Sequence, residues 1–174
     1  PKREHLSIGV LTTRRGGANL NESYQRYLER LGIQKPFLEE RHGFMIPMRP
    51  RAEALGIRRV LFVGDAAGLA DPITAEGITA AIVSGQLAAR AILQGNFEES
   101  AVKQAYGRSL SAHLLPELRV ARILARLLFD CPRLRAMLFS RHGDRICGLV
   151  TNIVQGASSY LETVRRPGNY LKLF

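Results

Sequence analysis

The chain has 174 residues, with 25 lysines and arginines against 15 aspartates and glutamates, and a formal net charge of +10 at pH 7. Hydrophobic residues make up 46% and charged residues 23%, which excludes a disordered tail, a collagen-like repeat and a coiled coil. Two cysteines, Cys131 and Cys147, are too few for a disulfide framework or a four-cysteine iron–sulfur cluster. We therefore expect free thiols in apolar helical surroundings and a cytoplasmic protein.

The first fifty residues predict the end of a sheet and one helix. Alternation in Leu6–Thr12 predicts a strand. Gly43–Met48 predicts a second, short strand, and its Pro47 favours a sheet edge or the end of a strand. Between them, Asn19 or Asn21 is the expected N-cap of a helix that stops at Gly32.

The middle of the chain predicts a buried strand, a turn of small residues and a long helix. Val60–Val63 is continuously apolar, which is typical of a strand buried on both faces in a parallel sheet. A Gly-Asp-Ala-Ala-Gly turn follows at 64–68, and a helix is expected from about Ala75 to Leu93, with small residues that favour close packing against other backbone. Open α/β sheets bind ligands at the carboxyl ends of such strands.

The residue types of this turn suit an electron-rich cofactor. Gly64 allows a ligand to approach closely, and the Asp65 carboxylate can accept hydrogen bonds from a polyol or ribose-like chain. Pro72 stiffens the loop, and the first N–H groups of the helix near Glu76 carry partial positive charge. Glu76 itself is better explained as a first-turn acid than as a general acid. The alternative is a strand–turn–helix of a nucleotide fold that binds no flavin.

Residues 64–78 resemble the second flavin-binding motif of the geranylgeranyl reductase family, within the p-hydroxybenzoate-hydroxylase-type flavoprotein superfamily. The family pattern is Gly-Asp-Ala-Ala-Gly, three residues, Pro, two residues, and then Gly-Glu-Gly-Ile. Nine positions agree with this pattern: Gly64, Asp65, Ala66, Ala67, Gly68, Pro72, Glu76, Gly77 and Ile78. Ala75 departs from it, because the family usually has Gly there, so an Ala needs a different backbone angle or tightens the approach to the flavin.

The resemblance extends upstream, where Gly43, Ile46 and Pro47 match a Gly-x-x-Ile-Pro strand of the family. It implies an FAD-dependent oxidoreductase that reduces geranylgeranyl double bonds by hydride transfer from the reduced flavin, on an isoprenoid small-molecule or lipid substrate. Asp65 would bind the ribityl region, residues 72–78 would bracket the isoalloxazine, and Ile46 and Pro47 would lie near the substrate. The electron donor, NADPH or another, stays open. We expect no catalytic side chain and no metal site, because the flavin carries the redox chemistry.

Other enzymes of the superfamily are the first alternative. Aromatic hydroxylases usually carry His where this chain has Gly68, and the related quinone oxidoreductases carry a four-cysteine cluster. A monooxygenase, a halogenase and a quinone-linked dehydrogenase without the cluster remain open. The alternative of a different class is a basic helical module that binds a membrane or a polyanion without redox activity. Aromatic residues do not interleave with the basic ones, which disfavours nucleic acid.

No Gly-x-Gly-x-x-Gly fingerprint follows a strand in this chain, and one parallel strand cannot form a sheet. With the start at Pro1, this predicts an α/β (α+β, mostly helical) fragment of a Rossmann-like flavoprotein, which lacks its N-terminal half and binds FAD weakly or not at all alone. Three parts are expected. Residues 1–50 are the end of the substrate-domain sheet with one helix, residues 51–97 hold the second FAD motif, and residues 98–174 are a basic helical region.

This last region carries most of the positive charge. Residues 101–174 hold 12 basic and 4 acidic side chains, whereas residues 1–100 hold 13 and 11. Four helices are expected, over residues 99–112, 116–129, 132–139 and 145–164. Arg119, Arg122 and Arg126 line one side of the second helix. A solvated helix face explains them, and the alternative is a helix that faces phosphate groups or lies on a membrane surface, with peripheral membrane association.

Overall fold

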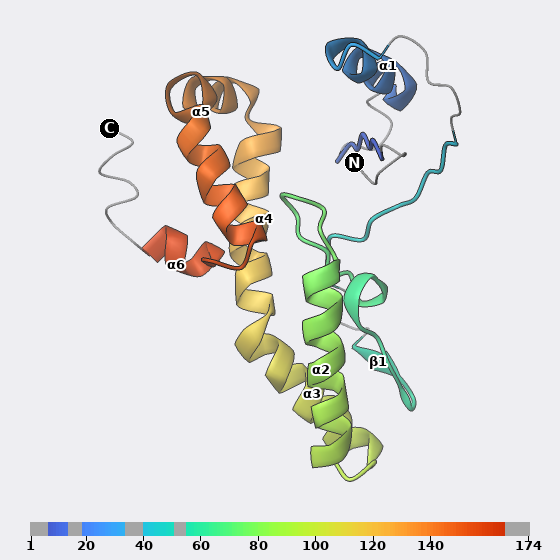
Figure 1. Cartoon of the computed structure of the whole chain (residues 1–174). Helices are drawn as coiled ribbons and strands as arrows, with labels where there is room; N and C mark the ends of the chain where they lie inside the picture. Colours follow the sequence, from blue (N-terminus) through green and yellow to red (C-terminus); the bar gives the residue numbers. More distant parts are fainter. Residues whose placement is uncertain (1–6, 14–18, 34–39, 51–54, 166–174) are drawn as a thin grey trace. The chain divides into compact units, whose positions relative to one another are not determined.

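The computed structural model describes residues 7–13, 19–33, 40–50 and 55–165 (Figure 1). The chain divides into two compact units, Pro1–Phe44 and Met45–Phe174. The described part is mostly helical, as expected, and its β-structure is one two-stranded sheet. The three functional parts expected from the sequence stay a prediction.

The first unit contains α1 (Leu20–Arg30). Asn19 is its N-cap, as predicted, because the side-chain oxygen accepts a hydrogen bond of 3.2 Å from the N–H of Glu22. The chain leaves the helix through Gly32, whose φ of +71° lies in the left-handed region that favours glycine. Both ends of α1 therefore follow from local sequence.

The two strands predicted in the first fifty residues are wrong. In the described part of the chain, residues 7–12 and 43–48 pair with no strand, and Leu6 lies outside that part. Ile8 and Val10 are half-buried between exposed neighbours, so the expected alternation of burial is present. A strand also needs a hydrogen-bonded neighbour, which alternation alone does not supply.

The core of the second unit lies between α2 (Ile78–Gln94) and α3 (Glu99–His113), which pack side by side (Figure 1). Its buried residues are Ala67, Leu69, Ala80, Leu87, Ala88, Ala91, Tyr106, Leu110 and Leu118. The start of α2 was predicted three residues too early, because Ala75 adopts a positive φ of 59° that no α-helix contains.

A short hairpin precedes α2. Strands β1 (Gly56–Ile57) and β2 (Val60–Leu61) pair antiparallel. The predicted strand over 60–63 is thus confirmed only at its first two residues. Its described partner is antiparallel, and Val60 is 56% exposed rather than buried. The carbonyl of Phe62 accepts a hydrogen bond of 2.8 Å from the hydroxyl of Tyr106 on α3, which holds this end of the hairpin against the core.

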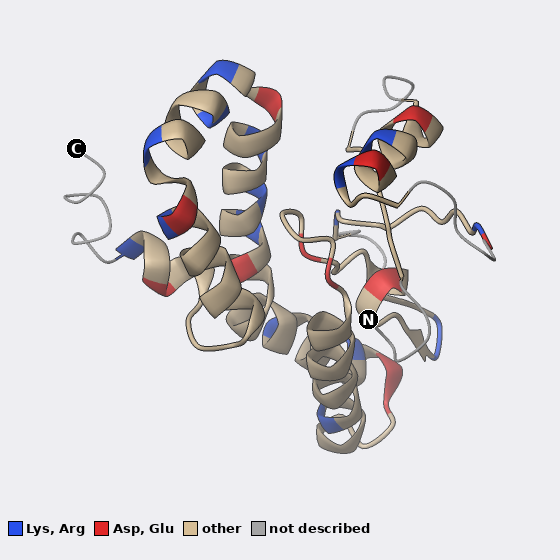
Figure 2. Cartoon of the chain, turned by 45° about the horizontal axis from the view of Figure 1, so that its top comes forward, with Lys and Arg blue, Asp and Glu red and all other residues tan. Residues whose placement is uncertain are grey.

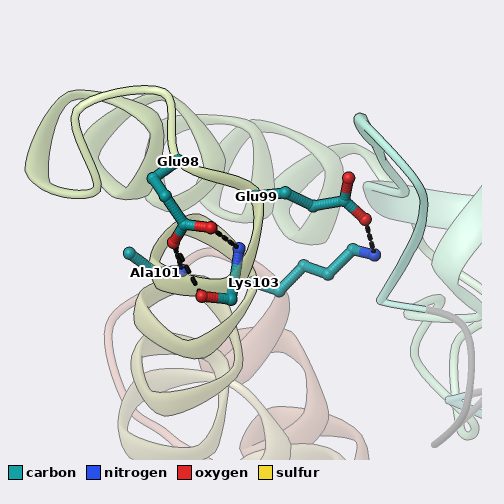
Figure 3. Close-up of polar contacts among 5 residues, drawn as sticks. Glu98, Glu99, Ala101 and Lys103 are labelled. Atoms are coloured by element: carbon teal, nitrogen blue, oxygen red, sulfur yellow. Dashed lines mark hydrogen bonds and ion pairs between the residues drawn. The ribbon is translucent and has the colours of Figure 1, made fainter.

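The junction between α2 and α3 is closed by a side-chain cap on α3 (Figure 3). The Glu98 carboxylate accepts hydrogen bonds from the hydroxyl of Ser100 at 2.7 Å and from the N–H groups of Ala101 and Ser100 at 2.6 and 3.0 Å. These bonds, the one from the Ser100 hydroxyl first, hold the pKa of Glu98 below its usual value. One turn of α3 also carries an ion pair of 2.7 Å between Glu99 and Lys103.

Helices α4 (Leu115–Asp130), α5 (Pro132–Val154) and α6 (Tyr160–Arg165) complete the unit. The helices predicted over 99–112 and 116–129 are confirmed to within one residue. The break predicted between residues 139 and 145 is present as a kink at His142 (φ −135°, ψ 22°), through which α5 continues. The helix predicted over 145–164 is wrong in its second half, because α5 ends at Val154 and α6 begins at Tyr160.

The expected surroundings of the two cysteines are wrong. Both cysteines are exposed, contrary to the apolar surroundings expected for them. None of the described helices has the length and apolar character needed to cross a membrane.

Candidate functional site

The Gly-Asp motif forms a tight turn packed directly on α2. Residues Gly64–Ala67 make one turn of 3-10 helix, η1. The N–H of Gly64 donates a hydrogen bond of 2.9 Å to the buried hydroxyl of Ser84. Gly64 has a φ of +51°, and a Cβ at this position would lie 2.8 Å from the Cβ of Ala81. Conformation and space therefore both require glycine here.

Gly68 ends η1 and lies against the backbone of residues 49–50. Its φ is +71°, and a Cβ there would lie 2.1 Å from the carbonyl oxygen of Arg49. The backbone of residues 49–50 thus crosses directly over the turn. Ile46, which is 38% exposed, and the half-buried Pro47 lie just before this crossing in the chain. Residues 43–48, which resemble the Gly-x-x-Ile-Pro strand, form no strand, and the contact with the turn is made by the backbone that follows them, at Arg49 and Pro50.

Asp65 lies against the N-terminus of α2. Gly77 is the N-cap of this helix, and a Cβ on Gly77 would lie 2.6 Å from Oδ1 of Asp65. The Asp65 side chain is exposed, so its carboxylate can receive hydrogen bonds from outside the chain. The partial positive charge of the helix N-terminus stabilises a carboxylate in this position. Position 77 therefore requires glycine, because any Cβ there would clash with the Asp65 carboxylate.

The loop between the turn and α2 is organised by Asp71. Its Oδ1 accepts hydrogen bonds from the N–H groups of Ile73 at 2.7 Å and Thr74 at 2.9 Å, and its own N–H donates to the carbonyl of Glu76 at 2.8 Å. Pro72 is buried inside this loop. Asp71 was not among the predicted site residues, although Asp-Pro after a run of small residues is a recognisable turn signal.

Ala75 occupies the left-handed conformation, with a φ of +59°. Its N–H donates a hydrogen bond of 2.9 Å to the carbonyl of Asp71, which closes the loop. Of the two outcomes considered for an Ala in this place, the structure shows an Ala held in a conformation that favours glycine.

Glu76 and its neighbours form the edge of the helix N-terminus. Oε1 of Glu76 accepts a hydrogen bond of 2.9 Å from the N–H of Thr79 in the first turn of α2, but Glu76 itself lies one residue before the N-cap Gly77, outside the first turn in which it was expected. The N–H groups of Gly77 and Ile78 have no acceptor among the described residues, and the Ile78 side chain is 73% exposed. Ala66 is exposed and Ala67 is buried. Asp65, Gly77 and Ile78 therefore form the accessible edge of the motif.

A tyrosine from the end of the chain reaches this loop. Tyr160 of α6 is buried, and its hydroxyl has no hydrogen-bond partner in the described residues. Burial first, and then the negative charges of Asp71 and Glu117, raise the pKa of Tyr160 well above its usual value. The N–H of Leu161 donates a hydrogen bond of 3.2 Å to Oε2 of Glu117, which ties α6 to α4. No sequence signal connects Tyr160 to Asp71.

The residues of this site fit the cofactor that the motif implies. An exposed carboxylate suits the hydroxyl groups of a ribityl chain, and unpaired helix N–H groups suit an electron-rich ring edge. The close contacts at Gly64 and Gly77 hold the turn on Ala81 and the Asp65 carboxylate at the helix N-terminus. In the part that the structure describes, no cluster of three or more His, Cys, Asp or Glu side chains could hold a metal ion.

Comparisons with known proteins assign the chain to no family. No protein-family model matches the chain, and no solved structure matches it. Uncharacterized protein Mbar_A1602 of Methanosarcina barkeri is 33% identical over 114 residues, which cover 63% of this chain and 29% of that protein. The chain therefore matches less than a third of the length of this curated relative.

Proposed function

We propose that the chain is the C-terminal portion of an FAD-dependent oxidoreductase that reduces geranylgeranyl double bonds in an isoprenoid small molecule or lipid. The observation that supports this most is the meeting of Asp65 with the N-cap Gly77, because it brings the two halves of the motif together at one accessible edge. Bound FAD would supply the hydride. In this proposal the chain's own residues bind and orient the flavin, with Asp65 accepting hydrogen bonds from hydroxyl groups.

The outer face of α2 supports the view that a further domain belongs here. An apolar stripe runs along it at helical spacing, and its members are Ile78, Ile82, Gly85, Ala89 and Leu93. Ile82 is 58% and Leu93 72% exposed, while the opposite face of the helix is buried in the core. A contiguous exposed apolar stripe of this kind often marks a surface that another part of a protein covers. We propose that the missing N-terminal half, with its Rossmann-like sheet, covers this stripe.

The first experiment titrates the chain alone with FAD. We expect weak binding or none, because the proposal assigns the pyrophosphate-binding fingerprint to the missing half. Submicromolar binding by this chain would contradict its assignment as a portion of the enzyme, without contradicting the flavin itself.

The second experiment uses the protein together with its upstream sequence. The proposal expects a Trp-x-Phe element just before Pro1, a Gly-x-Gly-x-x-Gly further upstream, and a yellow protein after purification. Asp65→Ala should raise the dissociation constant for FAD at least about tenfold, which corresponds to the loss of one charge-assisted hydrogen bond of about 1.5 kcal/mol, and should lower FAD occupancy accordingly. Asp130→Ala, at the exposed end of α4, is the matched control. Equal occupancy in the two variants would refute the assigned role of Asp65.

The reaction itself is tested with the holoprotein and geranylgeranyl diphosphate under reducing conditions. We expect products with added hydrogen at the prenyl double bonds, detected by mass. Hydroxylated or halogenated aromatic products, or reduction of a quinone without prenyl reduction, would replace the reductase by one of the other flavin enzymes.

A further inference from the structure

Helices α4 and α5 present arginine and apolar side chains together on exposed stripes. The members recur at steps of three or four residues: Arg119, Ile123, Arg126 and Leu127 on α4, and Arg133, Met137 and Arg141 on α5. All seven are exposed, and the apolar ones by 45 to 59%. Residues at this spacing lie on one face of a helix, so each helix has a mixed arginine–apolar stripe.

Helices α4 and α5 together carry a net positive charge. Residues 115–154 contain seven arginines and three carboxylates. Figure 2 shows basic segments at intervals along α4 and α5, with few acidic ones between them. In the described residues no ion pair is formed by Arg119, Arg126 or Arg133. Their guanidinium groups are therefore available to an external anion.

The structure changes which arginines belong to the surface. Arg122 is only partly exposed, and its Nε is buried without a hydrogen-bond partner among the described residues. Arg119 and Arg126, the other two arginines predicted on this face of α4, are exposed, as is Leu127 beside Arg126. The set of arginines predicted from α4 alone is thus replaced by one that spans both helices.

We propose that the arginine–apolar stripes of α4 and α5 bind the surface of an anionic lipid bilayer. Guanidinium groups pair with lipid phosphates, and the apolar side chains between them enter the boundary between headgroups and acyl chains. The long stems of arginine allow both contacts at the same depth. The interleaved side chains on these stripes are aliphatic, which distinguishes them from a nucleic-acid surface, where aromatic side chains stack on bases.

The experiment measures binding of the full 174-residue chain to vesicles by flotation, without FAD, so its outcome is independent of the proposed flavin function. Binding is expected to vesicles of phosphatidylglycerol and phosphatidylcholine in equal parts, and not to phosphatidylcholine alone. Replacing Arg119, Arg126 and Arg133 with Gln should lower the partition coefficient about 100-fold, or about fivefold for each basic side chain near the surface. Replacing Arg30, Arg59 and Arg90 with Gln removes the same charge from exposed positions elsewhere, and should lower it less than about fivefold.

A second variant keeps the charge and removes the apolar contact. Ile123→Ser, Leu127→Ser and Met137→Ser together should lower vesicle binding at least about tenfold, because each loses apolar area that would enter the bilayer. Circular dichroism verifies that each variant is folded. Unchanged vesicle binding by this variant, or equal binding of the chain to duplex DNA and to anionic vesicles, would show a general polyanion surface and overturn the proposal.

Discussion

The N–H of Gly64 donates a hydrogen bond of 2.9 Å to the hydroxyl of Ser84, twenty residues later in the chain. Ser84 is fully buried, and its hydroxyl donates in turn to the carbonyl of Ala80 at 2.6 Å. The Ser84 hydroxyl therefore supplies the acceptor for the buried N–H of Gly64 and holds the turn on the first half of α2. The small residues of α2 were predicted to allow close packing against other backbone, and the contact of Gly64 with Ala81 confirms this.

Ser84→Ala should destabilise the chain by about 1–3 kcal/mol, because it leaves the buried N–H of Gly64 without an acceptor. The measurement is the free energy of unfolding from urea titration. Ser111→Ala, on the exposed side of α3, is the matched control and should change stability by less than about 0.5 kcal/mol. Equal effects of the two substitutions would mean that Ser84 is not the link between the turn and the helix.

Gly68→Ala should destabilise the chain, unlike the same substitution at a glycine in the interior of a helix. The new Cβ meets the backbone at Arg49, and the residue must also keep a φ of +71°. We expect a loss of about 2–4 kcal/mol, from about 1–2 kcal/mol for the left-handed conformation and a further cost of overpacking.

The control for Gly68 is Gly85 in the interior of α2, where a Cβ would meet nothing within 4 Å. Gly85→Ala should stabilise the chain by up to about 1 kcal/mol, because Ala is the better helix former. The two substitutions add the same methyl group and should move the unfolding midpoint in opposite directions. A shift in the same direction would show that the segment over Gly68 gives way.

Local features of this fold follow from the sequence. Asn19 caps α1, Gly32 follows the end of α1 in the left-handed conformation, and α3 begins at its predicted start. Each of these depends on a few neighbouring residues and on hydrogen bonds between them. Within residues 64–78, glycine is required at Gly64, Gly68 and Gly77 by close contacts with Ala81, Arg49 and Asp65.

Features that depend on distant residues did not follow from the sequence. The continuous apolar run at 60–63 predicted a strand buried on both faces, but Val60 faces solvent, while Phe62 is held by Tyr106 from another helix. Apolar runs of four residues do not specify their partners. The approach of Tyr160 to Asp71 likewise depends on the packing of α6 on α4, which includes the hydrogen bond between Leu161 and Glu117.

Ala75→Gly should stabilise the chain. Ala at a φ of +59° costs about 1–2 kcal/mol, while Gly adds about 0.4–1 kcal/mol of unfolded-state entropy, so the net gain is about 0.5–1 kcal/mol. Ala89→Gly, on the exposed side of α2, is the matched control and should cost about 1 kcal/mol. Thermal unfolding distinguishes the two. A destabilising Ala75→Gly would mean that the loop from Asp71 to Gly77 does not hold this residue in the left-handed region.

Tyr106→Phe should cost about 1–1.5 kcal/mol, because it removes the hydrogen bond to the carbonyl of Phe62. Tyr160→Phe should cost much less at neutral pH, since the buried Tyr160 hydroxyl has no hydrogen-bond partner in the described structure. The contrast is measured by urea unfolding at pH 7. Equal costs would indicate that Tyr160 makes a hydrogen bond as strong as that of Tyr106.

The same two tyrosines should make stability fall at alkaline pH. Burial raises the pKa of both, so the folded state binds their protons more tightly than the unfolded state does. Their contribution is fully present below the unfolded value of 10.0 and is lost as the pH rises above it toward the folded values. Each can steepen the fall by up to about 1.4 kcal/mol per pH unit. Tyr160→Phe should therefore flatten the decline between pH 10 and 11, with only the small effect at pH 7 described above. Tyr27→Phe, at an exposed position of α1, controls for loss of a hydroxyl. An unchanged alkaline slope in Tyr160→Phe would mean that Tyr160 is not buried beside Asp71.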